Sequence, residues 1–299
     1  MSPNQDSSKN LKMPIEFNVR MFAIGSGLFM LAQIIGMLTG FLNLKLPEFA
    51  ETLAVGPSIG GFVIAFMIAT AVLIVLLKFL KGNFFFKLML GALIFIGSVE
   101  VLSTFMFDWL SIVLALALVV LRFWKPTVFT QNFTMTLAIA GIGASIGLMV
   151  PVVAVIAILL ILSVYDYIAV YKTGHMVKLF KSLLSKNVPL SLVVPDKMQG
   201  FNEHVDTASP GKDKSGARRF MMLGTGDIAF PIIFAVSALR HSLFSGLAVL
   251  FGAFFGIIAV YSILMNSKKG AIPALPPIAL CTITAFLLSI IVELLVVIV

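Results

Sequence analysis

Residues 221–231 read MMLGTGDIAFP, and Asp227 stands inside this otherwise apolar run. A charged side chain in the middle of a membrane span costs roughly 2.5–3.5 kcal/mol on insertion scales, and such residues usually serve a function. Gly224 and Gly226 come directly before the aspartate. If this run is a membrane span, the cost of its carboxylate calls for a partner elsewhere in the chain.

The composition is that of a membrane protein. Of the 299 residues, 60% are hydrophobic and only 11% are charged, and the mean hydropathy is +1.10. A soluble domain carries about 25% charged residues, so we predict a polytopic membrane protein. The net charge of +8 is explained by basic residues in the connections between apolar runs, so we expect no nucleic-acid partner. No cleavable signal peptide is expected, because a full-length span follows the polar first 20 residues.

The apolar runs predict the fold class. A membrane-spanning helix needs about 20 mostly apolar residues. We therefore predict an all-α protein with about nine transmembrane helices, the fourth of them short. The predicted spans are 21–42, 57–80, 84–107, 109–124, 131–149, 151–173, 220–239, 243–265 and 274–298.

The distribution of lysine and arginine predicts the topology. About 19 basic residues fall on one side of these spans and about 2, Lys45 and Arg240, on the other, and cytoplasmic connections carry the excess. We expect an integral multi-pass membrane protein with a cytoplasmic N-terminus and an external C-terminus.

The chain then divides into three parts: a cytoplasmic tail (1–20), five spans within 21–149, and four spans within 150–299. The last part includes a cytoplasmic loop, 174–219. The polar stretch DKMQGFNEHVDTASPGKDKSGARR in that loop predicts a mobile segment. The preceding run, LSLVVP (190–195), favours either a strand or packing at the membrane surface.

Two aspartates lie at nearly the same depth. Asp166 is six residues before Lys172, roughly 9 Å from the inner boundary, and Asp227 is eight residues after Arg219, roughly 12 Å deep. The segment PAL (273–275) enters at roughly 6–9 Å. Two carboxylates within hydrogen-bond reach do not readily both ionise, so such a pair shares a proton. One member then acts as a general base on water and the other as a general acid.

Other interpretations stay open from depth alone. A proton-coupled transporter uses the same physics, and a structural aspartate pair would need only mutual hydrogen bonds. Glu100 and Glu293 form a rival pair nearer the outer ends of their spans. They fit a proton relay, but we favour hydrogen bonding within the bundle or toward the outer interface.

The neighbouring residues favour catalysis. Tyr165 offers a phenol beside Asp166, although it would also serve as a packing aromatic. Gly224 and Gly226 allow another backbone to approach, or serve helix packing. The prolines of AIPALPP (271–277) interrupt helical hydrogen bonding at membrane depth, where backbone groups must line a cavity or find a partner. An extended substrate segment that adds as a strand would be such a partner.

These segments resemble the signatures of the GxGD intramembrane aspartyl proteases, the family of presenilin and signal peptide peptidase. The signatures are YD in the sixth span, GxGD in the seventh and PAL at the ninth. Here they read Tyr165-Asp166, Gly224-Thr225-Gly226-Asp227 and Pro273-Ala274-Leu275. The residues YKTGHM after the sixth span and the ending PALPP look most like archaeal presenilin homologues. Over the first five spans only the hydropathy matches.

The resemblance implies peptide-bond hydrolysis within the bilayer by an aspartic-type endopeptidase, with Asp166 and Asp227 as the catalytic pair. It places Tyr165, Gly224, Gly226 and the PAL residues at the substrate, a transmembrane peptide that unwinds near PAL. It implies no cofactor, and the three histidines lack the spacing of metal ligands.

The topology has the presenilin sense, so we expect substrates with external N-termini. No obligatory partner subunit is expected beside the lipid bilayer, and a homo-oligomer is compatible with the sequence. The loop 174–219 holds an apolar run of only about six residues, too short for a membrane segment, so no obligatory self-cleavage is expected.

Overall fold

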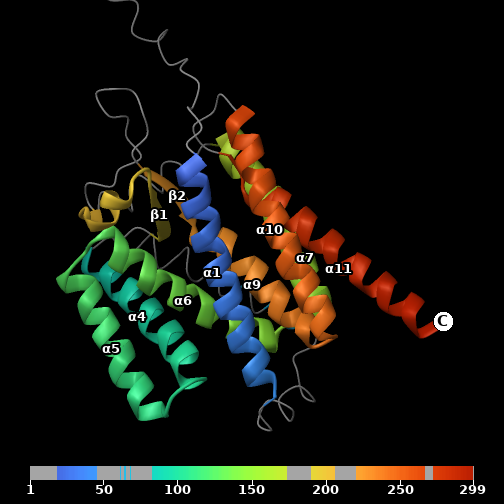
Figure 1. Ribbon diagram of the computed structural model, residues 1–299, viewed down its shortest axis with the longest axis horizontal. Helices are drawn as coiled ribbons and strands as arrows, with labels where there is room; N and C mark the ends of the chain where they lie inside the picture. Colours follow the sequence, from blue (N-terminus) through green and yellow to red (C-terminus); the bar gives the residue numbers. More distant parts are fainter. Residues whose placement is uncertain are drawn as a thin grey trace, which may run out of the picture.

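The computed structural model (Figure 1) is a bundle of long helices with two short strands at one end. It describes residues 19–45, 61, 64, 68, 83–173, 190–205, 220–266 and 272–298. The α-helices are α1 (Val19–Leu44), α4 (Asn83–Ser103), α5 (Asp108–Trp124), α6 (Val128–Met149), α7 (Val152–Ile168), α9 (Thr225–Leu239), α10 (Leu243–Asn266) and α11 (Leu275–Ile298). The remaining elements are the π-helix η1 (Ala169–Thr173), the strands β1 (Ser191–Pro195) and β2 (Phe220–Gly224), and the 3₁₀-helix η2 (Met198–Asn202).

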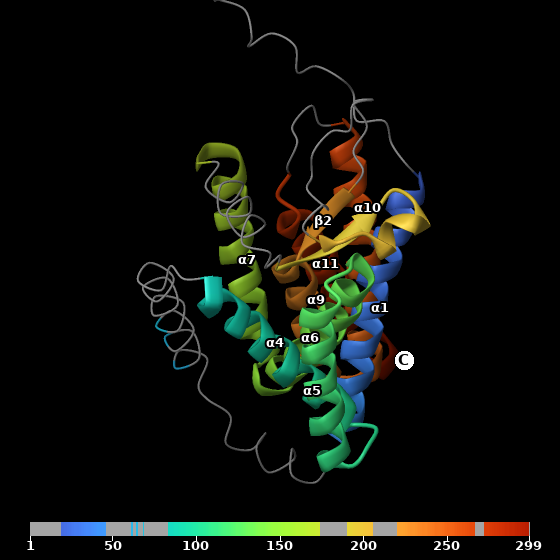
Figure 2. The ribbon, with the colours of Figure 1, turned by 90° about the vertical axis from the view of Figure 1, so that its left-hand side faces the viewer.

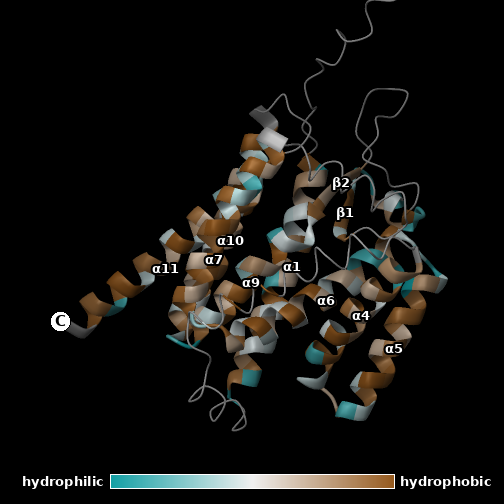
Figure 3. Cartoon of the chain, turned by 180° about the vertical axis from the view of Figure 1, so that it is seen from behind, coloured by the Kyte–Doolittle hydropathy of each residue, from teal (hydrophilic) through white to brown (hydrophobic). Residues whose placement is uncertain are grey.

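The all-α membrane fold is confirmed. Within the described residues, α-helices lie at eight of the nine predicted spans, and six of them are long and apolar enough to cross a membrane. Figure 3 shows hydrophobic residues along their whole length, as expected where the surrounding solvent is lipid. The predicted span 57–80 lies outside the described residues except for three positions, so the count of nine is not confirmed.

The prediction of a helix over 220–239 is wrong for its first five residues. Phe220–Gly224 forms β2, which pairs antiparallel with β1 so that Ser191 lies opposite Gly224, and α9 begins only at Thr225. A short apolar run at the start of a longer one cannot be distinguished from helix by periodicity, because a buried strand is equally apolar. The run at 190–195 does form a strand, and all five residues of β1 are buried.

The loop between α7 and α9 is partly ordered, so the prediction of a mobile segment is wrong for 196–205. The 3₁₀-helix η2 follows β1, and the chain then binds the connection between α5 and α6. Val205 N–H donates to Pro126 O at 2.9 Å, and Val128 N–H donates to Glu203 O at 3.0 Å. Val205 is buried and Phe201 packs on a small apolar cluster. This stretch therefore packs through a few apolar side chains although its composition is mostly polar. Residues 206–219 lie outside the described part.

The helix that carries Asp227 lies inside the bundle. Figure 2 shows α9 enclosed by its neighbours, and it packs against α1, α6, α7, α10 and α11. Every residue from Pro231 to Leu239 is buried. Pro231 also lacks the N–H that would bond to the Asp227 carbonyl, so the first turn of α9 is less tied to the helix than the rest.

Small residues bring the helices of the N-terminal half into backbone contact. A Cβ added at Gly141 of α6 would collide with the carbonyl of Gly97 on α4, and one added at Gly97 would collide with the backbone of Ala138. Membrane helices pack closely where small residues face each other, because lipid supplies no hydrophobic force to drive their association.

Gly141→Ala therefore tests this contact. The added methyl must push two backbones apart, and we expect a loss of stability of about 1–3 kcal/mol, as for other overpacked sites. Thermal unfolding in detergent measures it. Gly27→Ala on α1 is the control, because its Cβ would have no atom within 4 Å. An equal effect of the two substitutions would contradict the packing role of Gly141.

Candidate active site

Asp166 lies in the last full turn of α7 and is only 7% exposed. Its Oδ2 accepts a hydrogen bond of 3.3 Å from the backbone N–H of Leu275, the first residue of α11. The first N–H groups of a helix have no partner within that helix, and a carboxylate there is favoured by the helix dipole. Asp166 thus caps α11 from a different helix.

Asp227 lies at the start of α9, as Asp166 lies beside the start of α11. It is the third residue of that helix and half-buried, with Gly224 as the N-cap. A Cβ added at Gly224 would lie 2.9 Å from Asp227 Oδ2, so the carboxylate folds back over the N-cap residue. The glycine therefore leaves room for the carboxylate itself. The sequence alone predicts only room for a substrate backbone or close helix packing.

The two carboxylates belong to one site. Their charges are close enough to interact, although they come from α7 and α9, and Asp166 contacts the start of α11. Two helix N-termini, of α9 and α11, therefore converge on one pair of acidic groups. Such a pair in apolar surroundings retains a shared proton and can both accept a proton from water and donate one.

The PAL residues form the entrance to α11. Pro273, Ala274 and Leu275 are all buried, and the chain is not helical before Leu275. Ile278 N–H donates to Ala274 O at 3.4 Å, so helical hydrogen bonding starts at this alanine. Of the segment's backbone groups, the Leu275 N–H is the one that reaches the aspartates.

Two other predicted site residues, Gly226 and Tyr165, are exposed rather than buried. Gly226 is exposed, and a Cβ there would meet only Phe230, at 3.9 Å, so open space lies beside it. A Cβ added at Gly224 or Gly226 would meet no atom of α7 within 4 Å. Tyr165 is 62% exposed, so its side chain is not enclosed with the buried Asp166. It lies on the outside of the bundle rather than in the packed interior.

Two features of the site were missed from the sequence. The first is the π-helix η1 one turn after Asp166; at its start Ala169 N–H bonds to the carbonyls of both Tyr165 and Asp166. Single π-turns are frequent at functional sites, but no residue type marks them. The second is Gln33 of α1, a fully buried amide that donates to Ile228 O at 2.9 Å. An amide in an otherwise apolar span was the signal for it.

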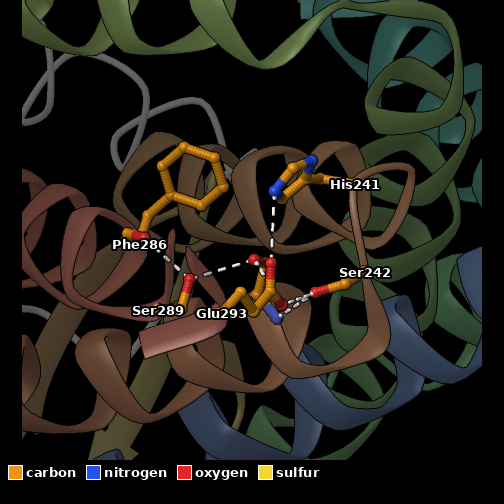
Figure 4. Close-up of polar contacts among 6 residues, drawn as sticks. His241, Ser242, Phe286, Ser289 and Glu293 are labelled. Atoms are coloured by element: carbon orange, nitrogen blue, oxygen red, sulfur yellow. Dashed lines mark hydrogen bonds and ion pairs between the residues drawn. The ribbon is translucent and has the colours of Figure 1, made fainter. Parts of the chain in front are cut away.

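The rival carboxylates Glu100 and Glu293 lie in two separate networks. Figure 4 shows Glu293 of α11 accepting a hydrogen bond from Ser242 and lying 3.2 Å from His241 Nε2. Glu100 of α4 accepts from Asn43 at 3.5 Å. Their interpretation as hydrogen-bonded groups of the bundle is confirmed. In the described part of the chain, histidine, cysteine and acidic side chains form no group of three that could hold a metal ion.

Fold and site together define a class: a multi-pass helical membrane protein with two aspartates at two converging helix N-termini. The sequence model described as "Signal-peptide peptidase, presenilin aspartyl protease" matches residues 26–295. The chain belongs to this family.

Solved structures share the fold. One structure of a presenilin family intramembrane aspartate protease, in space group C222, is 20% identical, with a TM-score of 0.55 over 88% of this chain and 94% of that chain. Another, in space group P2, is 21% identical, with a TM-score of 0.59 over 89% of this chain and 96% of that chain. The comparison with curated proteins found no match. The class of the chain is that of an aspartic-type intramembrane endopeptidase, and no finding supports a proton-coupled transporter.

The two glycines of the site can be tested separately. Gly224→Ala places a methyl against the Asp227 carboxylate, so we expect kcat to fall by about 10- to 100-fold, the scale of a small misplacement of a reacting group. Gly226→Ala fills open space in the free enzyme, so we expect normal folding and a raised KM if a substrate backbone passes there. Kinetics on a single-span peptide distinguish the two effects, and wild-type kcat in Gly224→Ala would contradict the first.

Proposed function

We propose that Asp166 and Asp227 are the catalytic pair with which this membrane protein hydrolyses peptide bonds of transmembrane helices. The single observation that carries the proposal is the hydrogen bond from Leu275 N–H to Asp166, on a carboxylate whose charge also interacts with that of Asp227. It supports the proposal because it links Asp166 with Asp227 and with the first residue of α11. Glu100 and Glu293, the other acidic residues of the predicted spans, are occupied by their own partners.

In the proposed mechanism the pair starts with one shared proton. The ionised carboxylate takes a proton from a water molecule, whose oxygen attacks the scissile carbonyl, while the other carboxyl donates its proton to the carbonyl oxygen. The leaving amine then takes the proton from the carboxyl that had accepted it from water, the C–N bond breaks, and a hydroxyl of the tetrahedral intermediate gives its proton to the other carboxylate as the carbonyl re-forms. The two carboxyls end with one proton between them, as at the start. Because the two groups titrate as a unit, activity should follow a bell-shaped pH profile.

Strand geometry supports a docking place for the substrate. Val193 directs both its N–H and its C=O to the side chain of Asn132, away from β2. Its opposite residue, Met222, is then in a non-hydrogen-bonded pair and directs its own backbone groups to the far edge of β2. We propose that an unwound substrate segment adds at this edge, next to Gly226 and PAL, because main-chain hydrogen bonds recognise extended peptides of any sequence.

The topology completes the proposal. The basic residues favour a cytoplasmic N-terminus, an external C-terminus and the β1–β2 end of the bundle on the cytoplasmic side. The segment 150–299 would carry the catalytic groups. The proposed substrates are transmembrane peptides with external N-termini, and neither an added subunit nor self-cleavage is part of the proposal.

Asp166→Asn and Asp227→Asn test the pair. Each replaces a carboxyl that must accept or donate a proton, so we expect either substitution to lower cleavage of a single-span peptide in liposomes by at least about 100-fold. Glu100→Gln is the matched control: it also neutralises an intramembrane carboxylate, yet that carboxylate lies in another network and should leave cleavage unchanged. Normal cleavage by either asparagine variant would reject the catalytic pair.

Substrate orientation is a second test. Two peptides share one apolar core but carry flanking charges that insert them with external or cytoplasmic N-termini. We expect cleavage mainly of the first, at a bond roughly 9–12 Å from the cytoplasmic boundary, the depth of the aspartates. Mass spectrometry of the products identifies the bond. Efficient cleavage of the second peptide alone would contradict the proposed topology.

A further inference from the structure

The side chain of Asn132 binds the backbone of β1 as a third strand would. Its Nδ2 donates to Val193 O at 2.7 Å, and Val193 N–H donates to its Oδ1 at 2.8 Å. Asn132 lies in the second turn of α6 and is 2% exposed. A primary amide presents one donor and one acceptor side by side, and here both meet one strand residue.

The preceding residue adds to this attachment. Gln131 Nε2 donates to Ser191 O at 3.3 Å, and its Oε1 accepts a hydrogen bond from Arg122 of α5. Ser191 and Val193 are alternate residues of β1, as expected for groups that face the same edge of a strand. Two consecutive amides of α6 thus hold two points of β1.

From β1 the attachment reaches the proposed active site. Ser191 is paired with Gly224, the last residue of β2 and the N-cap of α9, and Asp227 follows three residues later. Two-stranded sheets are marginally stable by themselves, so the position of β1 and β2 depends on what holds their edges. The anchor, α6, packs between α1, α4 and α9 in the interior of the protein.

We propose that Asn132 is a positioning residue for the reaction, which fixes β1 and, through β2, the place of Asp227 at the start of α9. The inference rests on the proposed catalytic role of Asp227. Removing the amide leaves the N–H and C=O of Val193 buried without partners, so the strands must shift to find others. A shift of about 1 Å in a supporting element is enough to lower a catalytic rate by about 100-fold.

The test compares Asn132→Leu, of similar size but without hydrogen bonds, with Asn132→Gln, which keeps the amide on a longer side chain. Thr136→Val is the control, because Thr136 lies one turn further along α6, is 3% exposed and has a hydroxyl without a hydrogen-bond partner. The readouts on a single-span peptide are kcat, KM, the masses of the products, and hydrogen exchange of segments 190–195 and 220–224.

We expect Asn132→Leu to lower kcat by about 10- to 100-fold, with a smaller change of KM, faster exchange in both strands and cleavage at displaced bonds. Asn132→Gln should lose less activity but also displace the cleaved bond, and Thr136→Val should match the wild type. A merely structural role would lower the melting temperature and the amount of folded enzyme, without displacing the bond.

Wild-type kcat and cleavage pattern in folded Asn132→Leu would overturn the inference. If that variant does not fold, Asn132→Gln decides, and an unchanged cleavage pattern in it would overturn the inference equally. Displaced cleavage in Thr136→Val as well would also contradict it. Full activity of Asp227→Asn in the same assay would instead reject the catalytic pair, so the two failures are distinguishable.

Discussion

The hydrogen bond from Leu275 N–H to Asp166 joins two parts of the site that lie 109 residues apart in the chain. Within an apolar bundle a carboxylate needs donors, and the first N–H groups of a helix need acceptors. The N–H at the start of α11 and the carboxylate at the end of α7 are each other's hydrogen-bond partner, and this bond holds the PAL segment beside the aspartate. Pro276 and Pro277 follow Leu275 in the first turn of α11 and have no N–H, so the Leu275 N–H is the first that the helix can offer to the carboxylate.

Asp227 is positioned by the end of strand β2, whereas a hydrogen bond from another helix holds Asp166. If 220–239 were one continuous helix, Asp227 would lie in its interior, where backbone N–H groups already have helical partners. Because β2 ends at Gly224, α9 begins at Thr225, and its first N–H groups, which lack partners within the helix, and its positive dipole end lie beside the carboxylate. The strand therefore has two consequences: it makes Thr225 the start of a helix within the bundle, and it leaves the edge at which we propose that an extended substrate adds. The resting sheet is held to α6 by Asn132 and Gln131.

The expected convergence of Asp166, Asp227 and PAL came from counting residues at 1.5 Å each, because helices that cross one bilayer bring equal depths together. The rule that a span needs about 20 apolar residues placed β2 in a helix, since FMML is as apolar as a span and only its pairing with β1 makes it a strand. Gly224 was expected to leave space for a substrate or for helix packing, but it lies against the carboxylate of its own helix. The roles of Asn132 and Gln33 depend on backbone groups about 60 and 195 residues away, and such contacts leave no local pattern.

We propose that Asp166 and Asp227 act on one tetrahedral intermediate as a unit. The most direct measurement is the affinity of an aspartyl transition-state analogue for the wild type, Asp166→Asn, Asp227→Asn and the double variant, all in one detergent. We expect each single variant to bind the analogue at least about 100-fold more weakly and the double variant to bind no more than a few-fold more weakly still, because groups that act together are not additive. Wild-type affinity in either single variant, or losses that multiply in the double variant, would contradict this proposal.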